Sequence, residues 1–142
     1  MRAVLDANVL VSALISRAGA PASLVELWLV GEFELVVCET LLAELERALA
    51  HPKVRKRIAL ADAERFVLVL RELAELVPDP EDEPPVSSSD PGDDYLLALA
   101  AREQAQLVSG DEHLLSLRSR LPVSSPRQFL ELLERTSEPL SQ

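Results

Sequence analysis

Residues 2–11 are Arg2-Ala3-Val4-Leu5-Asp6-Ala7-Asn8-Val9-Leu10-Val11, an apolar run that Asp6 and Asn8 interrupt. A short apolar run that ends on a carboxylate is typical of a buried strand, and the following residues, without Gly or Pro, predict a helix. In open α/β sheets ligands bind where strands end and helices begin, which would place Asp6 in such a crevice. A cap of the following helix explains Asp6 or Asn8 equally well.

Composition limits the class of protein. The 142 residues, 48 % of them hydrophobic, fit one domain with an ample core, and the single cysteine, Cys38, excludes an internal disulfide and fits the cytoplasm. The net charge of -10 argues against nucleic-acid binding through a general basic field. Either nucleic acid is not the partner, or metal ions and a local basic patch offset the acids. No apolar run approaches a transmembrane length, so we expect no membrane association.

Apolar periodicity predicts alternating strands and helices, and therefore an α/β fold with a mainly parallel sheet. Further strands are expected at 33–38, 106–109 and 122–123, with a short one near 76–77 or 85–86. Helices are expected to start at Pro21, Glu39, Asp62 (as a cap), Glu112 and Ser125. The proline-rich residues 78–89 predict a surface loop.

Two glutamates border the apolar face of the helix that begins at Glu39. Leucines at 41, 42, 45 and 49 define that face, and Glu44 and Glu46 lie on its opposite borders. Glu44 could direct its carboxylate along the edge of the core, but an ordinary solvated glutamate explains it as well.

The segment from Asp90 to Asp94 contains more acids than a helix start needs. Asp90 is a good N-cap, Pro91 fits the first helical position, and Asp93 fits the third position of a capping box. Asp94 is then left at the head of an apolar helix face, where a charge is costly unless it is paired or bound to a metal. We therefore favour a functional role for Asp94.

Asp111 repeats the arrangement at Asp6, because it follows an apolar strand and precedes a short helix, although an N-cap again explains it. Two carboxylates 4 Å apart repel by roughly 4 kcal/mol at an effective dielectric of 20. Several strand-end acids therefore imply a cation, and oxygen-only ligands suit Mg²⁺ or Mn²⁺. Metal-assisted phosphodiester hydrolysis is the reaction class that this pattern indicates. The basic cluster 53–57 could contact phosphates or simply be solvated.

These motifs together resemble the PIN domain family, and within it the toxins of toxin–antitoxin systems, the VapC-like ribonucleases. The matching stretches are Val4-Leu5-Asp6-Ala7-Asn8-Val9-Leu10-Val11-Ser12-Ala13, Glu34-Leu35-Val36-Val37, Leu41-Leu42-Ala43-Glu44-Leu45, Asp90-Pro91-Gly92-Asp93-Asp94-Tyr95-Leu96-Leu97-Ala98-Leu99-Ala100 and Val108-Ser109-Gly110-Asp111. The resemblance implies a three-layer, Rossmann-like domain with four or five mainly parallel strands. It places a PIN domain at 1–133 and a flexible tail at 134–142.

The resemblance also implies a site. Asp6, Glu44, Asp94 and Asp111 take the positions of the family's four catalytic, metal-binding acids, which favours Glu44 over Glu46. Asn8, Asp93 and Ser109 take supporting positions. Many relatives carry Thr at position 7, where this chain has Ala7. The implied activity is Mg²⁺- or Mn²⁺-dependent endoribonuclease cleavage that leaves a 5′-phosphate and a 3′-hydroxyl.

The implied partners are an RNA substrate, which would approach along 53–57 with Arg118 and Arg120, a cognate antitoxin protein and a second copy in a homodimer. The alternative function is a non-catalytic PIN-like or receiver-like module that acts through protein binding. A receiver domain needs a lysine at the end of its last strand, and none follows near Val123. A dehalogenase-like phosphatase needs a second Asp where this chain has Asn8.

Overall fold

The computed structural model describes residues 1–81, 84 and 91–137, and five parallel strands form its central sheet. In spatial order the strands are β3 (Glu75–Leu76), β2 (Glu34–Val37), β1 (Arg2–Leu5), β4 (Gln106–Val108) and β5 (Val123–Ser124). The expected α/β architecture with a parallel sheet is confirmed. The residues quoted first in the sequence supply the middle strand, which pairs on both sides.

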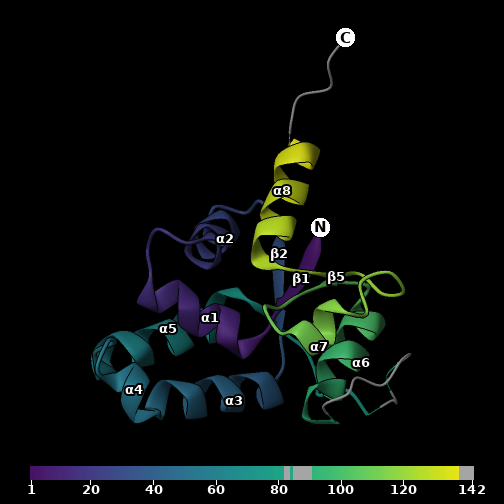
Figure 1. Cartoon of the computed structure of the whole chain (residues 1–142). Helices are drawn as coiled ribbons and strands as arrows, with labels where there is room; N and C mark the ends of the chain where they lie inside the picture. Colours follow the sequence, from purple (N-terminus) through teal and green to yellow (C-terminus); the bar gives the residue numbers. More distant parts are fainter. Residues whose placement is uncertain (82–83, 85–90, 138–142) are drawn as a thin grey trace.

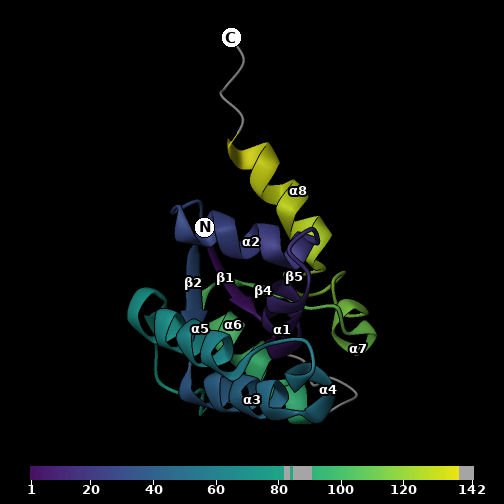
Figure 2. The same cartoon turned by 90° about the vertical axis from the view of Figure 1, so that its left-hand side faces the viewer.

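Helices cover both faces of this sheet and complete three layers (Figures 1 and 2). They are α1 (Ala7–Ile15), α2 (Ala20–Leu29), α3 (Glu39–Ala50), α4 (Pro52–Arg55), α5 (Leu60–Leu73), α6 (Asp94–Glu103), α7 (Glu112–Leu115) and α8 (Pro126–Ser137), with a 3-10 turn at Pro91–Asp93. Helix α1 packs against α2 and α3, whereas α6 packs against β1 and β4 from the opposite face. Among the described residues no single helix is long and apolar enough to cross a membrane; α1 and α2 pass that test only as a pair bent by 97°.

The core is built mainly from leucine and valine. Ala3, Val4 and Leu5 of the middle strand are fully buried, as expected for a parallel strand covered on both faces. The rings of Phe33 and Phe129 meet edge to face with their centroids 5.2 Å apart, so they attach α8 to the start of β2.

Two sequence-based expectations change in detail. The helix expected to be capped by Asp62 begins at Leu60, after Ala59, so Asp62 lies inside its first turn. The short third strand forms at Glu75–Leu76, whereas residues 85–86 lie outside the described residues. Helix α8 continues to Ser137, and the domain boundary at residue 133 stays a prediction.

The register of the middle strands fixes the edge where strands give way to helices. Leu5 of β1 lies opposite Val108 of β4, and the backbone N–H of Asp6 donates to the Val108 carbonyl at 2.9 Å. Asp6 and Ser109 are therefore neighbours, each one residue beyond its strand. The strand-to-helix junctions gather at this carboxyl edge, as the parallel fold predicted.

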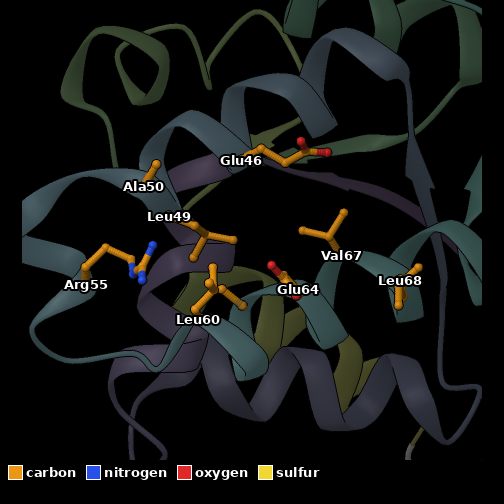
Figure 3. Close-up of a pocket in the computed structure, with 9 residues that line it drawn as sticks. Glu46, Leu49, Ala50, Arg55, Leu60, Glu64, Val67 and Leu68 are labelled. Carbon is orange, nitrogen blue, oxygen red and sulfur yellow. The ribbon is translucent and has the colours of Figure 1, made fainter.

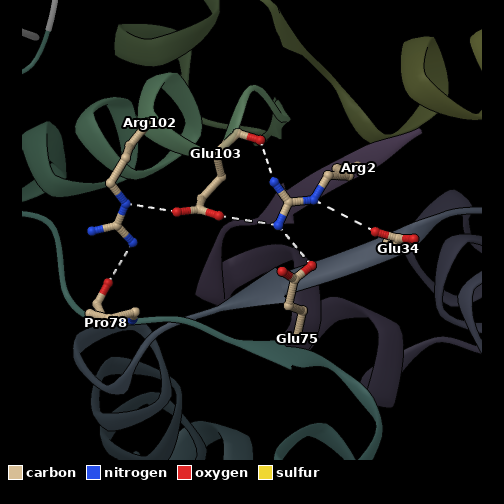
Figure 4. Close-up of polar contacts among 6 residues, drawn as sticks. All are labelled: Arg2, Glu34, Glu75, Pro78, Arg102 and Glu103. Carbon is tan, nitrogen blue, oxygen red and sulfur yellow. Dashed lines mark hydrogen bonds and ion pairs between the residues drawn. The ribbon is translucent and has the colours of Figure 1, made fainter.

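The opposite edge of the sheet holds a charge network around Arg2 (Figure 4). The Arg2 guanidinium contacts the carboxylates of Glu75 at 2.7 Å, Glu103 at 3.1 Å and Glu34 at 3.6 Å. Arg102 donates to Glu103 at 2.7 Å and to the Pro78 carbonyl at 2.6 Å. These contacts join β1, β2, β3 and the end of α6.

Replacing Arg2 with methionine should therefore destabilise the fold by about 1–2 kcal/mol, because three carboxylates lose a partly exposed partner. The hydrogen bond from Arg102, opposed by burial and assisted by Arg2, lowers the pKa of Glu103. The ionised Glu103 carboxylate therefore stabilises the fold at pH values above 4.5, the ordinary pKa of a glutamate. This stabilisation is lost as the pH falls through the lowered pKa of Glu103 in the folded protein. Urea unfolding should thus show a difference between wild type and Arg2→Met that shrinks below pH 4.5; an unchanged difference would contradict the network's role.

Candidate active site

Asp6, the first candidate acid, is almost completely buried at the carboxyl end of the middle strand. Only 5 % of the residue is exposed, and Ser109 beside it is fully buried. The Ser109 hydroxyl donates a hydrogen bond to Asp6 Oδ2 at 2.8 Å and accepts one from the Asp111 backbone N–H at 3.0 Å. The structure therefore brings Asp6, Ser109 and Asp111 together, and Ser109 connects the two acids.

Both strand-end acids also cap the helix that follows. Asp6 Oδ1 accepts from the Asn8 backbone N–H at 3.4 Å, and Asp111 Oδ1 accepts from the His113 backbone N–H at 2.8 Å. The capping explanation left open by the sequence is thus correct for both residues. It does not conflict with a functional role, because the other Asp6 oxygen is the one bonded to Ser109.

The surroundings of Asp6 disfavour its negative charge. Burial raises the pKa of Asp6 most strongly, and the negative charge of Asp111 raises it further. The hydrogen bonds from Ser109 and from the backbone at Asn8 lower it, but they do not reverse the shift. A nearby cation would relieve both the burial cost and the repulsion between the two carboxylates.

Glu44 and Glu46, which helix periodicity could not separate, have different environments. Glu44 is half-buried, and the Tyr95 hydroxyl from the first turn of α6 donates a short hydrogen bond to its Oε2. Glu46 is exposed and lies 3.7 Å from the guanidinium of Arg71, which also holds Glu39 at 2.8 Å. Only Glu44 is therefore directed toward the helix that contains Asp94.

Asp94 is half-buried as the first residue of α6. A 3-10 turn at Pro91–Asp93 precedes this α-helix, and Asp93 occupies the N-cap position of α6 without a side-chain capping bond. Asp90, the expected N-cap, lies outside the described residues. The capping box between Asp90 and Asp93 therefore stays a prediction, and the role of Asp94 depends on the family resemblance and on its place at the carboxyl edge.

The donor chemistry of these acids fits a hard divalent cation such as Mg²⁺ or Mn²⁺, since Asp6, Glu44, Asp94 and Asp111 offer only oxygen. Within residues 1–81, 84 and 91–137, however, no three His, Cys, Asp or Glu side chains lie close enough together to hold a metal ion. Among the described contacts, Ser109 joins the Asp6 carboxylate to the Asp111 backbone, and the Tyr95 hydroxyl bonds to Glu44. The common centre expected from the sequence is not formed by the side chains as they stand.

A shallow hollow of about 280 Å³ lies beside Asp111. Its lining includes Asn8, Ser12, Gly110 and Pro126, so one candidate supporting residue faces it. A more apolar groove of about 430 Å³ lies between α3, α4 and α5 (Figure 3). None of the candidate site residues lines that groove, whose walls include Leu49, Leu60 and Glu46.

The basic residues proposed to guide RNA do not form one strip. Arg118 and Arg120 are exposed in the turn after α7, near Asp111 in the chain. Residues 53–57 lie around α4, at the other end of α3 and apart from α7 (Figure 1). Only the first group lies on the side of the molecule that holds Asp111.

The family model described as the PIN domain matches residues 2–113, a span that contains all seven candidate residues. The chain belongs to the PIN domain family. An uncharacterized protein of Methanocaldococcus jannaschii, MJ1680, is 25 % identical over 145 residues, covering 95 % of this chain and 93 % of that protein. The crystal structure of VapBC2 from Rickettsia felis, bound to a DNA fragment from their promoter, contains a chain with a similar fold. The similarity has a TM-score of 0.56 at 15 % identity and covers 88 % of this chain and 98 % of that one.

Sequence reasoning gave no role to Tyr95, the residue of this PIN domain that contacts Glu44. One signal was available, because the only tyrosine in the chain directly follows Asp94 at the head of an apolar helix. Burial raises the pKa of Tyr95 well above its usual range, with further contributions from Glu44, Cys38 and Asp6. Tyr95 therefore remains a neutral hydroxyl donor among the acids at physiological pH.

Asp6→Asn should make the metal-free protein more stable, because it removes a buried and repelled charge while keeping the size of the side chain. In EDTA at pH 7 we expect a melting temperature a few degrees above that of wild type. Because the pKa of Asp6 is raised in the folded protein, its charge lowers the stability of wild type at pH values above 3.8, the ordinary pKa of an aspartate. The advantage of Asp6→Asn over wild type should therefore shrink as the pH falls toward 3.8. Asp62→Asn, at an exposed position, is the matched control, and equal melting temperatures for Asp6→Asn and wild type would contradict this account.

Proposed function

We propose that this PIN domain is a metal-dependent endoribonuclease and the toxin of a toxin–antitoxin pair. The observation that supports it most is the buried Asp6 carboxylate, linked through Ser109 to Asp111 at the carboxyl edge of a parallel sheet. A charge buried next to a second carboxylate is unfavourable in the empty protein. Its presence in this fold is best explained by a cation that balances it during function.

In this proposal Asp6, Asp94 and Asp111 hold Mg²⁺ or Mn²⁺, with Glu44 as a direct or water-mediated ligand. The bound ion would stabilise negative charge on the phosphoryl oxygens and activate water as the nucleophile. Ser109 keeps Asp6 oriented through its 2.8 Å hydrogen bond. As an alternative to a ligand role, Glu44 would help to deprotonate the attacking water.

The RNA strand would reach these residues across the hollow lined by Asn8, Ser12 and Gly110. The net charge of -10 means that contact with phosphates must be local. Arg118 and Arg120 are the basic residues that we assign to this contact. Asn8 and Asp93 would support the acids from the edges of the site.

Cleavage of a mixed RNA in Mn²⁺ tests the reaction. Wild type should cleave and EDTA should abolish cleavage, whereas Asp6→Asn, Asp94→Asn and Glu44→Gln should each lose at least about 100-fold in rate, or about 2.7 kcal/mol of transition-state stabilisation. Glu46→Gln is the matched control and should cleave like wild type, because Glu46 lies at the surface beside Arg71.

RNA cleavage that continues at an unchanged rate in EDTA would contradict the metal-dependent mechanism. Equal losses in Glu44→Gln and Glu46→Gln would contradict the assignment of Glu44. A chain that binds partners but cleaves nothing under any of these conditions would favour the non-catalytic alternative.

The toxin assignment draws on the fold shared with the VapBC2 chain, whose complex binds promoter DNA. A cognate antitoxin is therefore the protein partner that we propose, and a second copy of the chain is expected by the same resemblance. Sedimentation velocity of the isolated protein would test the homodimer.

We assign the antitoxin contact to a cleft of about 600 Å³ between α1, α2 and α5. Apolar side chains such as Leu14, Val25 and Trp28 line it. Three arginines (Arg17, Arg57 and Arg65) and one acid, Asp62, which lies 3.8 Å from Arg65, line it as well. Arginines beside apolar side chains suit an acidic peptide segment of the antitoxin that also carries apolar side chains. The net charge of this chain is -10, so such a segment would be repelled by most of the remaining surface. Trp28 is 6 % exposed and lines this cleft.

Expression in a bacterial host tests the toxin assignment. Wild type should arrest growth, Asp6→Asn should not, and co-expression of the cognate antitoxin should restore growth. The double variant Arg57→Glu, Arg65→Glu should stay toxic yet escape this rescue, because it reverses the charge at the cleft. Rescue equal to that of wild type would exclude the cleft as the antitoxin surface.

A further inference from the structure

Tyr95 connects two elements that lie on opposite faces of the sheet. It stands in the first turn of α6, while its hydrogen-bond partner Glu44 stands on α3, 51 residues earlier. The Tyr95 residue is half-buried, so its ring is partly enclosed, and its hydroxyl donates directly to Glu44 Oε2. This contact crosses the carboxyl edge of the sheet, where Asp6 and Asp111 also lie.

A glutamate that projects from one side of a helix has three side-chain torsions, and fixing them costs entropy. A hydroxyl donor on one carboxylate oxygen restricts the side chain to fewer orientations before any ligand arrives. In metal sites, groups that hydrogen-bond to ligands orient them, and their removal typically weakens metal binding by about 10- to 100-fold. Tyr95 has the geometry of such a group.

We propose that Tyr95 is a positioning residue: its hydroxyl holds the Glu44 carboxylate at the carboxyl edge of the sheet and so strengthens binding of a divalent cation by the acidic site. This inference rests on the proposed function, because it assigns a partner to one of the proposed metal ligands. Tyr95 itself does not bind the cation or the substrate. Its contribution passes entirely through Glu44.

A double-mutant cycle on the full chain tests this inference, with Mn²⁺ affinity measured by isothermal titration calorimetry. Tyr95→Phe keeps the ring and removes only the hydroxyl, and we expect it to bind Mn²⁺ about 10-fold more weakly than wild type. Glu44→Gln should weaken binding as well. The double variant should bind no more weakly than Glu44→Gln alone, because the Tyr95 hydroxyl acts only through that carboxylate.

Thr136→Val is the matched control, since it removes a hydroxyl on α8 that bonds to the Leu132 and Leu133 carbonyls, away from the acids. Its Mn²⁺ affinity should equal that of wild type. Circular dichroism and urea unfolding would establish that each variant is folded. If Tyr95→Phe does not fold, Tyr95→Met, which keeps an apolar side chain, takes its place in the cycle.

Wild-type affinity in the Tyr95 variant would overturn the positioning role while leaving the nuclease proposal intact. Additive losses in the double variant would also overturn it, because Tyr95 would then act by another route. If wild type itself binds no Mn²⁺, the proposed metal site and this inference both fail.

Discussion

The pairing of β1 with β4 is the constraint on which the rest of the site depends. Because Leu5 lies opposite Val108, the next residue of each strand is placed side by side, and a carboxylate and a hydroxyl meet inside the protein. A shift of either strand by one residue would turn Asp6 or Ser109 to the other face of the sheet. The fully buried residues Ala3, Val4 and Leu5 prevent that shift, since it would also displace the core.

Carboxylates at the two edges of the sheet are stabilised by different partners. At the amino edge, glutamates from three elements are paired with Arg2, and Arg102 adds a second cation. At the carboxyl edge, Asp6 and Asp111 are held by hydrogen bonds from a hydroxyl and backbone N–H groups, and their mutual repulsion remains. Charge that serves stability is thus separated from charge that we assign to function.

Much of the fold could be predicted because the apolar runs are short, continuous and separated by clear helix signals. The middle strand, the helix that begins at Glu39 and the strand before Ser109 all lie where periodicity placed them. Errors arose where several acids compete for one local role. Asp90 and Pro91 predicted a helix from residue 91, whereas residues Pro91–Asp93 form a 3-10 turn and the α-helix α6 begins at Asp94. The contact of Tyr95 with Glu44 joins residues 51 apart, so no local pattern could predict it.

Helix α8 has a consequence for how the molecule can be divided. The family match ends at residue 113, yet Phe129 of α8 is fully buried and stacks its edge against Phe33, at the start of β2. A truncated chain that ends at residue 113 would lack β5, so β4 would lose its hydrogen-bonding partner on that side. It would also lack Phe129, so the apolar surface around Phe33 would be exposed. The segment that the family model matches is therefore smaller than the packed domain, in which α8 covers part of the core.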